Sequence, residues 1–516
     1  MDVAVGAACA VLAWAKAIGV EHVVTDGEAC AAYARATFPV TRAIAAVLKP
    51  GCVADVQACV RIANEHRVPL YPVSGGKNWG LGSRAPSADG CALLDLSRLD
   101  RILDFDEGLA YLTVEPGVTF RQAHDFLEQR GAPLFLSMIG GPEDASLVGN
   151  AMERGDGQGP YSDRALYACA AQVVLPDGSL LDTGFARFEG AQVAPLARWG
   201  VGPSLDGLFT QSNLGIVTRM TFWLAPKAEH FATFFATLND KRQLADFVDA
   251  LRPLMLRDIV RPGCIGMWNV YKSLASEGGY PWAAMNGRTP LELNRNPGGN
   301  TEPWFASGTL LAWSDDHLRA LAAMVKPALA PVCARFSMMQ GAAHGPNAAA
   351  FPLGNHDPRA LRSVYWRKKM EPPADPDPER DRCGVTWVCP QMAFDGQRLA
   401  AGLRDFESIY RRYAFEPNIG IAPASSRAFH VYLAIMWDRD VSGEDERAMA
   451  CQDELQRAAL ALGYPPYRLG IQTMNVPGGQ PEYVETLRRL KRALDPRDVL
   501  APGRYDWRHE WRSDGD

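Results

Sequence analysis

Four glycines surround a Lys-Asn pair in the segment YPVSGGKNWGLGSRAP, residues 71–86, directly after an apolar run. Glycine tolerates positive φ angles, so such a loop can bring several backbone N–H groups together, as a pyrophosphate requires. The spacing matches neither G-x-x-x-x-G-K-[ST] nor G-x-G-x-x-G, and Asn78 stands where a P-loop needs a hydroxyl. The loop therefore predicts a phosphate-bearing cofactor held in a different kind of cradle.

Three other places carry side chains suited to acid-base or electrostatic catalysis. Asp163 follows a glycine-rich turn at 155–160 that would place it at a domain edge, where desolvation raises a carboxyl pKa; a surface turn is the simpler reading. Tyr467 and Arg468 offer a phenol donor beside a fixed cation, which suits a bound phenolate, or else form a strand with one snorkelling side chain. His430 lies in the apolar run RAFHVYLAIMW, where a lone histidine is more often a core residue.

Small-residue turns recur along the chain and bound apolar runs: EPGV at 115–118, SLVGN at 146–150 and LGIV at 214–217. Several turns that converge on one ligand would bury an elongated cofactor. The chain resembles the flavoproteins of the vanillyl-alcohol oxidase and p-cresol methylhydroxylase (PCMH) family in five segments that occur in the family's order. They are the glycine loop, GNAMERGDGQGPYSD (149–163), SLDGLFTQSNLGIVT (204–218), YR (467–468) and DPRDVLAPGR (495–504).

This resemblance implies an α+β fold of two domains. A PCMH-type FAD-binding domain would span residues 1–228 and be completed by 471–516, and an α+β cap or substrate domain would span 229–470. FAD would lie extended along the first domain. The residues then expected to contact it are Ser74, Gly75, Gly76, Lys77, Asn78, Trp79, Gly80, Leu81, Gly82, Ser83, Gly141, Ala145, Ser146, Gly149, Asn150, Arg154, Gly215, Ile216, Val217 and Arg504.

The resemblance also implies catalytic roles. Asp163 would lie beside the flavin N5 and act as the acid/base, Tyr467 and Arg468 would hold a phenolate oxygen, and His430 would lie near the pocket. The expected substrate pocket consists of Leu81, Trp387, Tyr467 and Arg468.

Two positions depart from the family pattern. Leu81 stands where phenol-oxidising members have a tyrosine donor in the glycine loop, and a phenolate held by fewer donors costs more to desolvate. Lys77 stands where some related flavoproteins have an FAD-linked histidine, and the cap segment GVTWVCP (384–390) has no His or Tyr. We therefore expect non-covalent FAD, with Cys383 or Cys389 as a remote alternative link.

The expected elements alternate between strand and helix. Strands are expected at 43–48, 70–73, 92–96 and 109–114, helices at 53–66 and 120–129, and a type I′ hairpin at 171–183 around Asp177-Gly178. A second unit begins near 225–227 and has helices at 241–251, 317–329, 397–413 and 447–462. Surface insertions are expected at 277–302 and 371–382.

Composition narrows the class of protein. A chain of 516 residues favours two domains. A net charge of -6 gives no basic surface for binding nucleic acid, and the short basic run at 367–369 is expected to be a solvated face. The 11 cysteines lack C-x-x-C spacing, which favours free thiols in a reducing compartment, the cytoplasm. The apolar stretch at 3–15 has no preceding Lys or Arg and is too short to span a bilayer, so neither a signal peptide nor a membrane anchor is expected. The histidines form no H-x-x-x-H or His-carboxylate cluster, so no metal site is expected.

The expected function is that of an FAD-dependent oxidase or dehydrogenase. It would remove hydride from a benzylic or otherwise activated carbon of an aromatic, 4-substituted phenol-like small molecule and pass electrons to O₂ or to a protein such as a cytochrome. Oxidation of a non-phenolic alcohol or amine in a biosynthetic pathway is the alternative, and a flavin-free binding protein is a third reading. The family resemblance also favours a homo-oligomer.

Overall fold

The computed structural model describes residues 3–277, 303–342 and 359–506, together with 279, 280, 282 and 354. Its first sheet is mixed, with strand order β1-β2-β4-β3: β1 (Val23–Val24), β2 (Ile44–Leu48), β3 (Leu70–Val73) and β4 (Cys91–Asp95). The strands β2, β4 and β3 are parallel, and helix α3 (Val53–His66) connects β2 to β3. Helices α1 (Val3–Ile18) and α3 bury Trp14 and Val56 against this sheet, and α2 (Gly27–Tyr33) follows β1.

The second sheet is antiparallel, with order β5-β6-β10-β8-β9: β5 (Ile102–Asp106), β6 (Tyr111–Val114), β8 (Ala168–Val174), β9 (Leu180–Asp182) and β10 (Ile216–Trp223). Helix α4 (Phe120–Gln129) begins at a capping box in which Thr119 and Gln122 satisfy each other's backbone N–H groups. The short helices α5 (Leu147–Met152) and α6 (Asp206–Phe209) and the ribbon of β7 (Leu134–Phe135) with β11 (Ala225–Pro226) complete this half.

The hairpin of β8 and β9 has a different turn from the expected one. Leu175 and Ser179 pair across three intervening residues, and only Gly178 among them has a positive φ, at 80°. A type I′ turn needs positive φ at both central residues, so the type I′ prediction was wrong, whereas the hairpin itself is present.

The third sheet has eight antiparallel strands, of which seven follow the order β15-β12-β14-β13-β18-β19-β16, while β17 pairs with β19. These strands are β12 (His230–Leu238), β13 (Ile265–Asn269), β14 (Trp304–Ala312), β15 (Arg335–Ala342), β16 (Cys383–Val388), β17 (Gln391–Ala393), β18 (Asn418–Pro423) and β19 (Ala428–Asp438). Its helices are α7 (Lys241–Leu256), α8 (Val270–Glu277), α10 (Asp315–Leu329), α11 (Arg359–Val364), α12 (Gly396–Arg412) and α13 (Glu444–Ala461).

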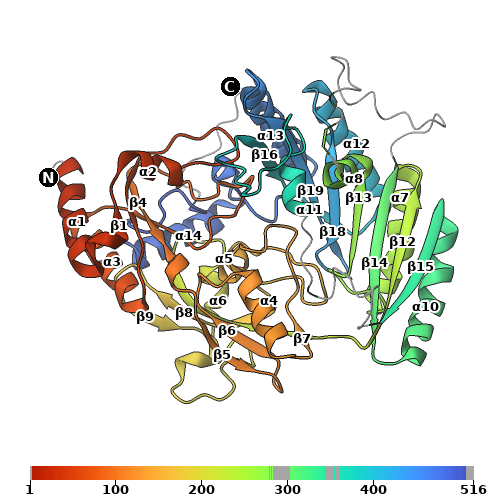
Figure 1. The fold of residues 1–516 in the computed structure, drawn as a ribbon, viewed down its shortest axis with the longest axis horizontal. Helices are drawn as coiled ribbons and strands as arrows, with labels where there is room; N and C mark the ends of the chain where they lie inside the picture. Colours follow the sequence, from red (N-terminus) through yellow and green to blue (C-terminus); the bar gives the residue numbers. More distant parts are fainter. Residues whose placement is uncertain are drawn as a thin grey trace.

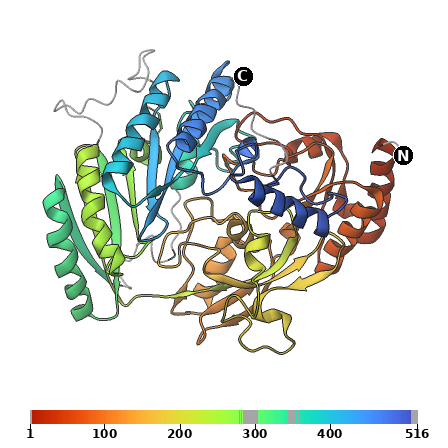
Figure 2. The same ribbon diagram turned by 180° about the vertical axis from the view of Figure 1, so that it is seen from behind.

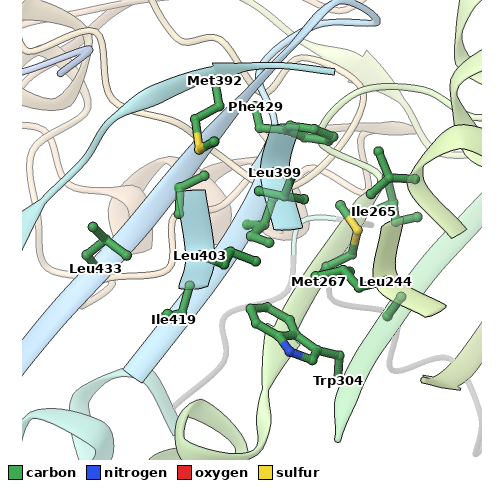
Figure 3. Close-up of a cluster of buried hydrophobic side chains, with 14 of the residues drawn as sticks. Leu244, Ile265, Met267, Trp304, Met392, Leu399, Leu403, Ile419, Phe429 and Leu433 are labelled. Carbon is green, nitrogen blue, oxygen red and sulfur yellow. The ribbon is translucent and has the colours of Figure 1, made fainter. Parts of the chain in front are cut away.

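Successive residues of a strand point to opposite faces of a sheet, and this alternation separates core from cavity. On β14, Ala306 and Leu310 join the apolar core under α7, α10, α12 and α13, whereas Ser307 and Thr309 line a cavity. Figure 3 shows part of this core, where Trp304 lies among aliphatic and methionine side chains.

The eight-stranded sheet occupies one side of the molecule and the two smaller sheets the other (Figure 1). The last helix, α14 (Pro481–Leu494), returns to the side of the N-terminal half, as Figure 2 shows from behind. There Leu490 and Leu494 pack against the core of the five-stranded sheet. The α+β fold expected from the sequence is confirmed.

The run at 367–369 is mostly buried, which corrects the expectation of a solvated face. Arg367 and Lys368 are 5% and 6% exposed. Arg367 pairs with Glu416 at 2.7 Å, and Lys368 pairs with Asp438 at 2.7 Å. The acidic partners lie on or beside β18 and β19, so the sequence run alone gave no sign of them.

Two further expectations concern segments at the surface and at a membrane. The insertion expected at 277–302 falls almost wholly outside the described residues, whereas 371–382 is described and is mostly half-buried or exposed. Within the described ranges, no helix combines the length and apolar character needed to cross a membrane.

Candidate active site

A cavity of about 790 Å³ lies between the two halves of the molecule. The glycine loop and the turns at 115–118, 146–150 and 214–217 all contribute to its wall, as the sequence predicts for turns that converge on one ligand. The wall includes these residues from the predicted cofactor set: Ser74, Gly75, Gly76, Lys77, Asn78, Trp79, Leu81, Gly82, Ser83, Gly141, Ala145, Ser146, Gly149, Asn150, Gly215, Ile216, Val217 and Arg504.

The backbone of the glycine loop requires glycine at several positions. Gly76, Gly80 and Gly82 have φ angles of 67°, 76° and 127°, which side-chain-bearing residues rarely adopt. A Cβ on Gly80 would also lie 2.1 Å from Cδ1 of Trp387 on β16. The loop is therefore shaped both by its own conformation and by the cap strand that lies against it.

The turn at 146–150 packs so closely against the glycine loop that side chains would not fit between them. A Cβ on Gly149 would lie 2.4 Å from the Ser74 hydroxyl oxygen, and one on Gly75 would lie 3.2 Å from the backbone nitrogen of Ser146. Ser146 accepts a hydrogen bond from the Gly149 N–H at 2.9 Å and donates to the carbonyl of Pro116 at 2.6 Å. This backbone-lined cradle, flanked by Lys77 and Arg504, fits the pyrophosphate of FAD.

Two predicted cofactor residues lie outside the cavity wall. The N–H of Gly80 donates to Thr37 Oγ1 at 2.8 Å and its carbonyl accepts from Gln472 at 2.9 Å, so its polar groups hold the loop in place. Arg154 donates to Thr210 Oγ1 at 3.0 Å and lines a separate hollow of about 590 Å³. The contact of these two residues with the cofactor stays a prediction.

Asp163 also lies away from the cavity wall. Its carboxylate accepts a hydrogen bond from the N–H of Leu166 at 2.9 Å in a local turn, the surface-turn reading of the sequence. The carboxylate in the wall belongs to Asp156, whose backbone bridges that of Asp163 within the same glycine-rich segment. Asp156 is thus the carboxylate of this segment that lines the cavity, and the acid/base role of Asp163 stays a prediction.

Asp156 joins the two halves of the molecule through the cap strand β19. His430 Nδ1 lies 2.5 Å from Asp156 Oδ2, and the Tyr432 hydroxyl donates to the same oxygen. Burial, with the adjacent negative charge of Asp156, raises the pKa of Tyr432 well above its ordinary value. Tyr432 is therefore a neutral hydrogen-bond donor at working pH.

Tyr467 and Arg468 lie in the cavity wall next to this cluster. The Tyr467 ring stacks on His430 with centroids 3.7 Å apart and an interplanar angle of 9°. Burial raises the pKa of the Tyr467 phenol, and the charge of Arg468 opposes that shift. The structure brings His430 into contact with Tyr467, although His430 itself is behind the wall.

The Arg468 guanidinium is held by the glycine loop. Its Nη2 donates to the side-chain oxygen of Asn78, and its Nε is buried with no partner among the described residues. Arg468 lines the cavity wall together with Tyr467, so its positive charge is placed to face an anionic ligand there. Leu81 and Trp387 add apolar surface to the same wall, as expected for the substrate pocket.

Comparisons with known proteins show which flavoproteins the chain resembles. The chain matches the FAD binding domain family over residues 44–184. It is 45% identical to 1'-carboxy-chondrochloren decarboxylase of Chondromyces crocatus, over 97% of this chain and 98% of that protein. It is 29% identical to the 4-cresol dehydrogenase [hydroxylating] flavoprotein subunit of Pseudomonas putida, over 94% and 93% of the two chains. The crystal structure of p-cresol methylhydroxylase with substrate bound superposes with a TM-score of 0.86 at 26% identity, covering 97% of this chain and 96% of that one.

A PCMH-type fold with this glycine-lined cradle defines an FAD-dependent oxidoreductase. The chain belongs to the vanillyl-alcohol oxidase and p-cresol methylhydroxylase family of FAD-linked flavoproteins.

The sequence reasoning missed Asp156 and Tyr432. Tyr432 stands two residues after His430, and the strand period of two places both on one face of β19. Asp156 lies inside the glycine-rich turn at 155–160, so its place in that turn, close to Asp163 in the sequence, could have identified it. Within the described ranges, no group of three or more His, Cys, Asp or Glu side chains could hold a metal.

Proposed function

We propose that this FAD-dependent enzyme removes hydride from an activated carbon next to the ring of a phenol-like substrate. The observation that carries the proposal is the hydrogen-bonded pair of Tyr467 and Arg468 in the cavity wall, beside the aromatic side chains of Trp387 and Tyr432. FAD, when bound, supplies the hydride acceptor. The FAD-binding part would span residues 1–228 and 471–516, and the cap 229–470.

The residues of the site have distinct tasks in this proposal. Arg468 compensates the charge of a substrate phenolate and Tyr467 donates a hydrogen bond to it, so that electron density moves toward the carbon that loses hydride. Asp156 takes the acid/base role, because it lies in the wall and is oriented by His430 and Tyr432.

Loss of CO₂ can accompany such an oxidation. The 45% identical relative is named a decarboxylase. Removal of hydride from the ring-bound carbon of a phenolate leaves that carbon electron-poor. If the neighbouring carbon carries a carboxylate, its C–C bond can break, CO₂ leaves, and the bonding pair forms a C=C bond that restores the phenolate. We propose oxidative decarboxylation as the form the reaction takes here.

Flavin reduction under anaerobic conditions tests the proposed function. Purified protein should show flavin bands near ~370 and ~450 nm. The ~450 nm band should bleach on mixing with 4-ethylphenol or 3-(4-hydroxyphenyl)propanoate. Bleaching by aliphatic alcohols or amines and not by phenols would favour the second candidate, a non-phenolic substrate, to which Leu81 adds support because it removes a phenolate donor.

Reoxidation and assembly belong to the same proposal. Reduced enzyme would pass electrons to O₂ or to a protein acceptor such as a cytochrome. Rapid return of the ~450 nm band on adding air would identify an oxidase, and slow return would identify a dehydrogenase. Location in the cytoplasm and formation of a homo-oligomer also remain proposals.

A further inference from the structure

Lys272 places a cation in the cap side of the cavity. It lies in the first turn of α8, which follows β13 directly, and its side chain is part of the cavity wall. A Cβ on Gly420 of β18 would lie 3.1 Å from both Cδ and Cε of Lys272. The ammonium lies over the Trp387 ring, 5.8 Å from its centroid. Gly420 thus leaves room for the lysine stem, and Trp387 faces its charge.

The charge of Lys272 has no carboxylate partner among the described residues. Burial alone lowers its pKa, with no opposing acidic group nearby. Two other lysines that are at least partly buried have carboxylate partners: Lys77 pairs with Asp144 at 2.9 Å and Lys491 with Asp495 at 2.6 Å. A desolvated cation without a partner is costly, and an incoming anion removes that cost.

The surroundings of Lys272 supply further donors to an anion. Ser273, next along α8, also lines the cavity and accepts a hydrogen bond from Trp268 Nε1 at 3.0 Å, which leaves its own hydroxyl proton available. Ser307 and Thr309 of β14 lie in the same wall. Ser273 therefore supplies a hydroxyl donor next to Lys272, and Ser307 and Thr309 add polar groups elsewhere in the wall.

A continuous aromatic wall connects Lys272 to the Tyr467 end. Trp387, beneath the ammonium, meets Tyr432 edge to face with centroids 6.5 Å apart and an interplanar angle of 88°. Tyr432 meets Tyr467 at 6.3 Å and 90°. One ligand lying along this wall can place an anionic group at each end and an aromatic ring between them.

We propose that Lys272 binds a carboxylate of the substrate, at the end of the cavity opposite Tyr467 and Arg468. The substrate class is then a 4-hydroxyphenyl compound whose side chain bears a carboxylic acid. This inference rests on the proposed function, because it takes the Arg468 end as the phenolate site.

Calorimetric binding to the FAD-loaded protein tests the proposal without turnover. The probes are 3-(4-hydroxyphenyl)propanoate and its amide, which has nearly the same shape without the charge. Both are titrated anaerobically into enzyme whose flavin has first been reduced with dithionite, so that neither probe can be oxidised. Wild type should bind the acid at least about tenfold more tightly than the amide. Lys272→Met should abolish that difference by weakening the acid, with the amide unchanged. Lys326→Met, at an exposed site on α10, is the matched control and should change neither.

A second variant keeps the test decisive if Lys272→Met loses its FAD. Gly420→Ala adds a methyl group against the lysine stem and should weaken the acid several-fold more than the amide. Equal affinity of acid and amide for wild type, or full acid affinity in Lys272→Met, would overturn the carboxylate site while leaving the phenol site intact. Failure of both probes and of 4-ethylphenol to bind would overturn the proposed function together with it.

Discussion

Two groups of buried charges in the cap half differ in how they are compensated. Arg367 lies between Glu416 and Glu444, at 2.7 and 3.4 Å, and Lys368 lies between Asp438 and Asp440, at 2.7 and 2.6 Å. Lys272, in the cavity wall, has no carboxylate partner among the described residues.

Arg468 lies between these two cases. It lines the cavity and hydrogen-bonds to the neutral amide of Asn78 and to Tyr467, and the nearby Tyr467 and Glu153 hold its pKa above the ordinary value against desolvation. Position in the cavity wall therefore separates Lys272 and Arg468 from Arg367 and Lys368. The missing carboxylate partner is particular to Lys272, where the protein leaves room for the charge of a ligand.

The largest expected effect comes from breaking the paired cluster. Arg367→Met leaves Glu416 buried without its cation, whereas Glu444 keeps Arg447 at 2.8 Å, and the loss should lower the free energy of unfolding by about 3–5 kcal/mol. Urea unfolding followed by circular dichroism measures it. Lys369→Met, next in the run and exposed, should change stability by less than about 0.5 kcal/mol. Equal effects of the two variants would show that the cluster is not a structural unit.

Asp156 should affect chemistry and not folding. Asp156→Asn should slow reduction of bound flavin by a phenol about 10²- to 10⁴-fold with FAD content unchanged, because the acid/base in the wall is lost. Asp163→Asn is the matched control and should reduce at nearly the wild-type rate. Anaerobic stopped-flow absorbance measures both, and a larger loss in Asp163→Asn would return the acid/base role to that residue.

Arg468 should be sensitive to shape as well as charge. Arg468→Lys retains a cation but loses the planar fork that reaches both Asn78 and the cavity. Flavin reduction by phenols should fall about 10²-fold, with thermal stability nearly preserved. If instead stability falls as much as in Arg367→Met and phenol reduction is unchanged, Arg468 belongs with the structural charges.

The smallest effect is expected at the neutral wall residue Cys389. Burial raises the pKa of its thiol to about 12, so it is a poor nucleophile near neutral pH. Cys389→Ser should therefore keep its FAD, and acid precipitation of wild type and variant should release the yellow colour into the supernatant. Colour retained in the wild-type pellet and lost in the variant would reveal a thioether link.

Local sequence signals predicted the cofactor side of the molecule well. The spacing of apolar residues gives helix 53–66 and strand 70–73 at their observed bounds, and the glycine loop lines the cavity as expected. These features depend on backbone conformation and short-range pattern, which one sequence carries directly.

The partners of the buried polar side chains could not be predicted from the sequence, because they lie far away along the chain. Arg367 finds its acidic partners 49 and 77 residues along the chain, and Asp156 meets His430 across 274 residues. No pattern within either segment specifies such a partner. For the same reason, the sequence analysis named Asp163 and not Asp156, which reaches the cavity wall through the placement of the glycine-rich turn against β19.

The contact between Gly80 and Trp387 has a consequence for how this family can diversify. The indole of the cap strand fills the space that a side chain at position 80 would occupy, so the two halves interlock at the flavin loop. Exchanging cap regions between relatives must therefore transfer these two positions as a pair. We expect a chimera that joins Trp387 to a loop with any larger residue at 80 to be purified colourless, whereas restoring glycine there should restore the yellow protein.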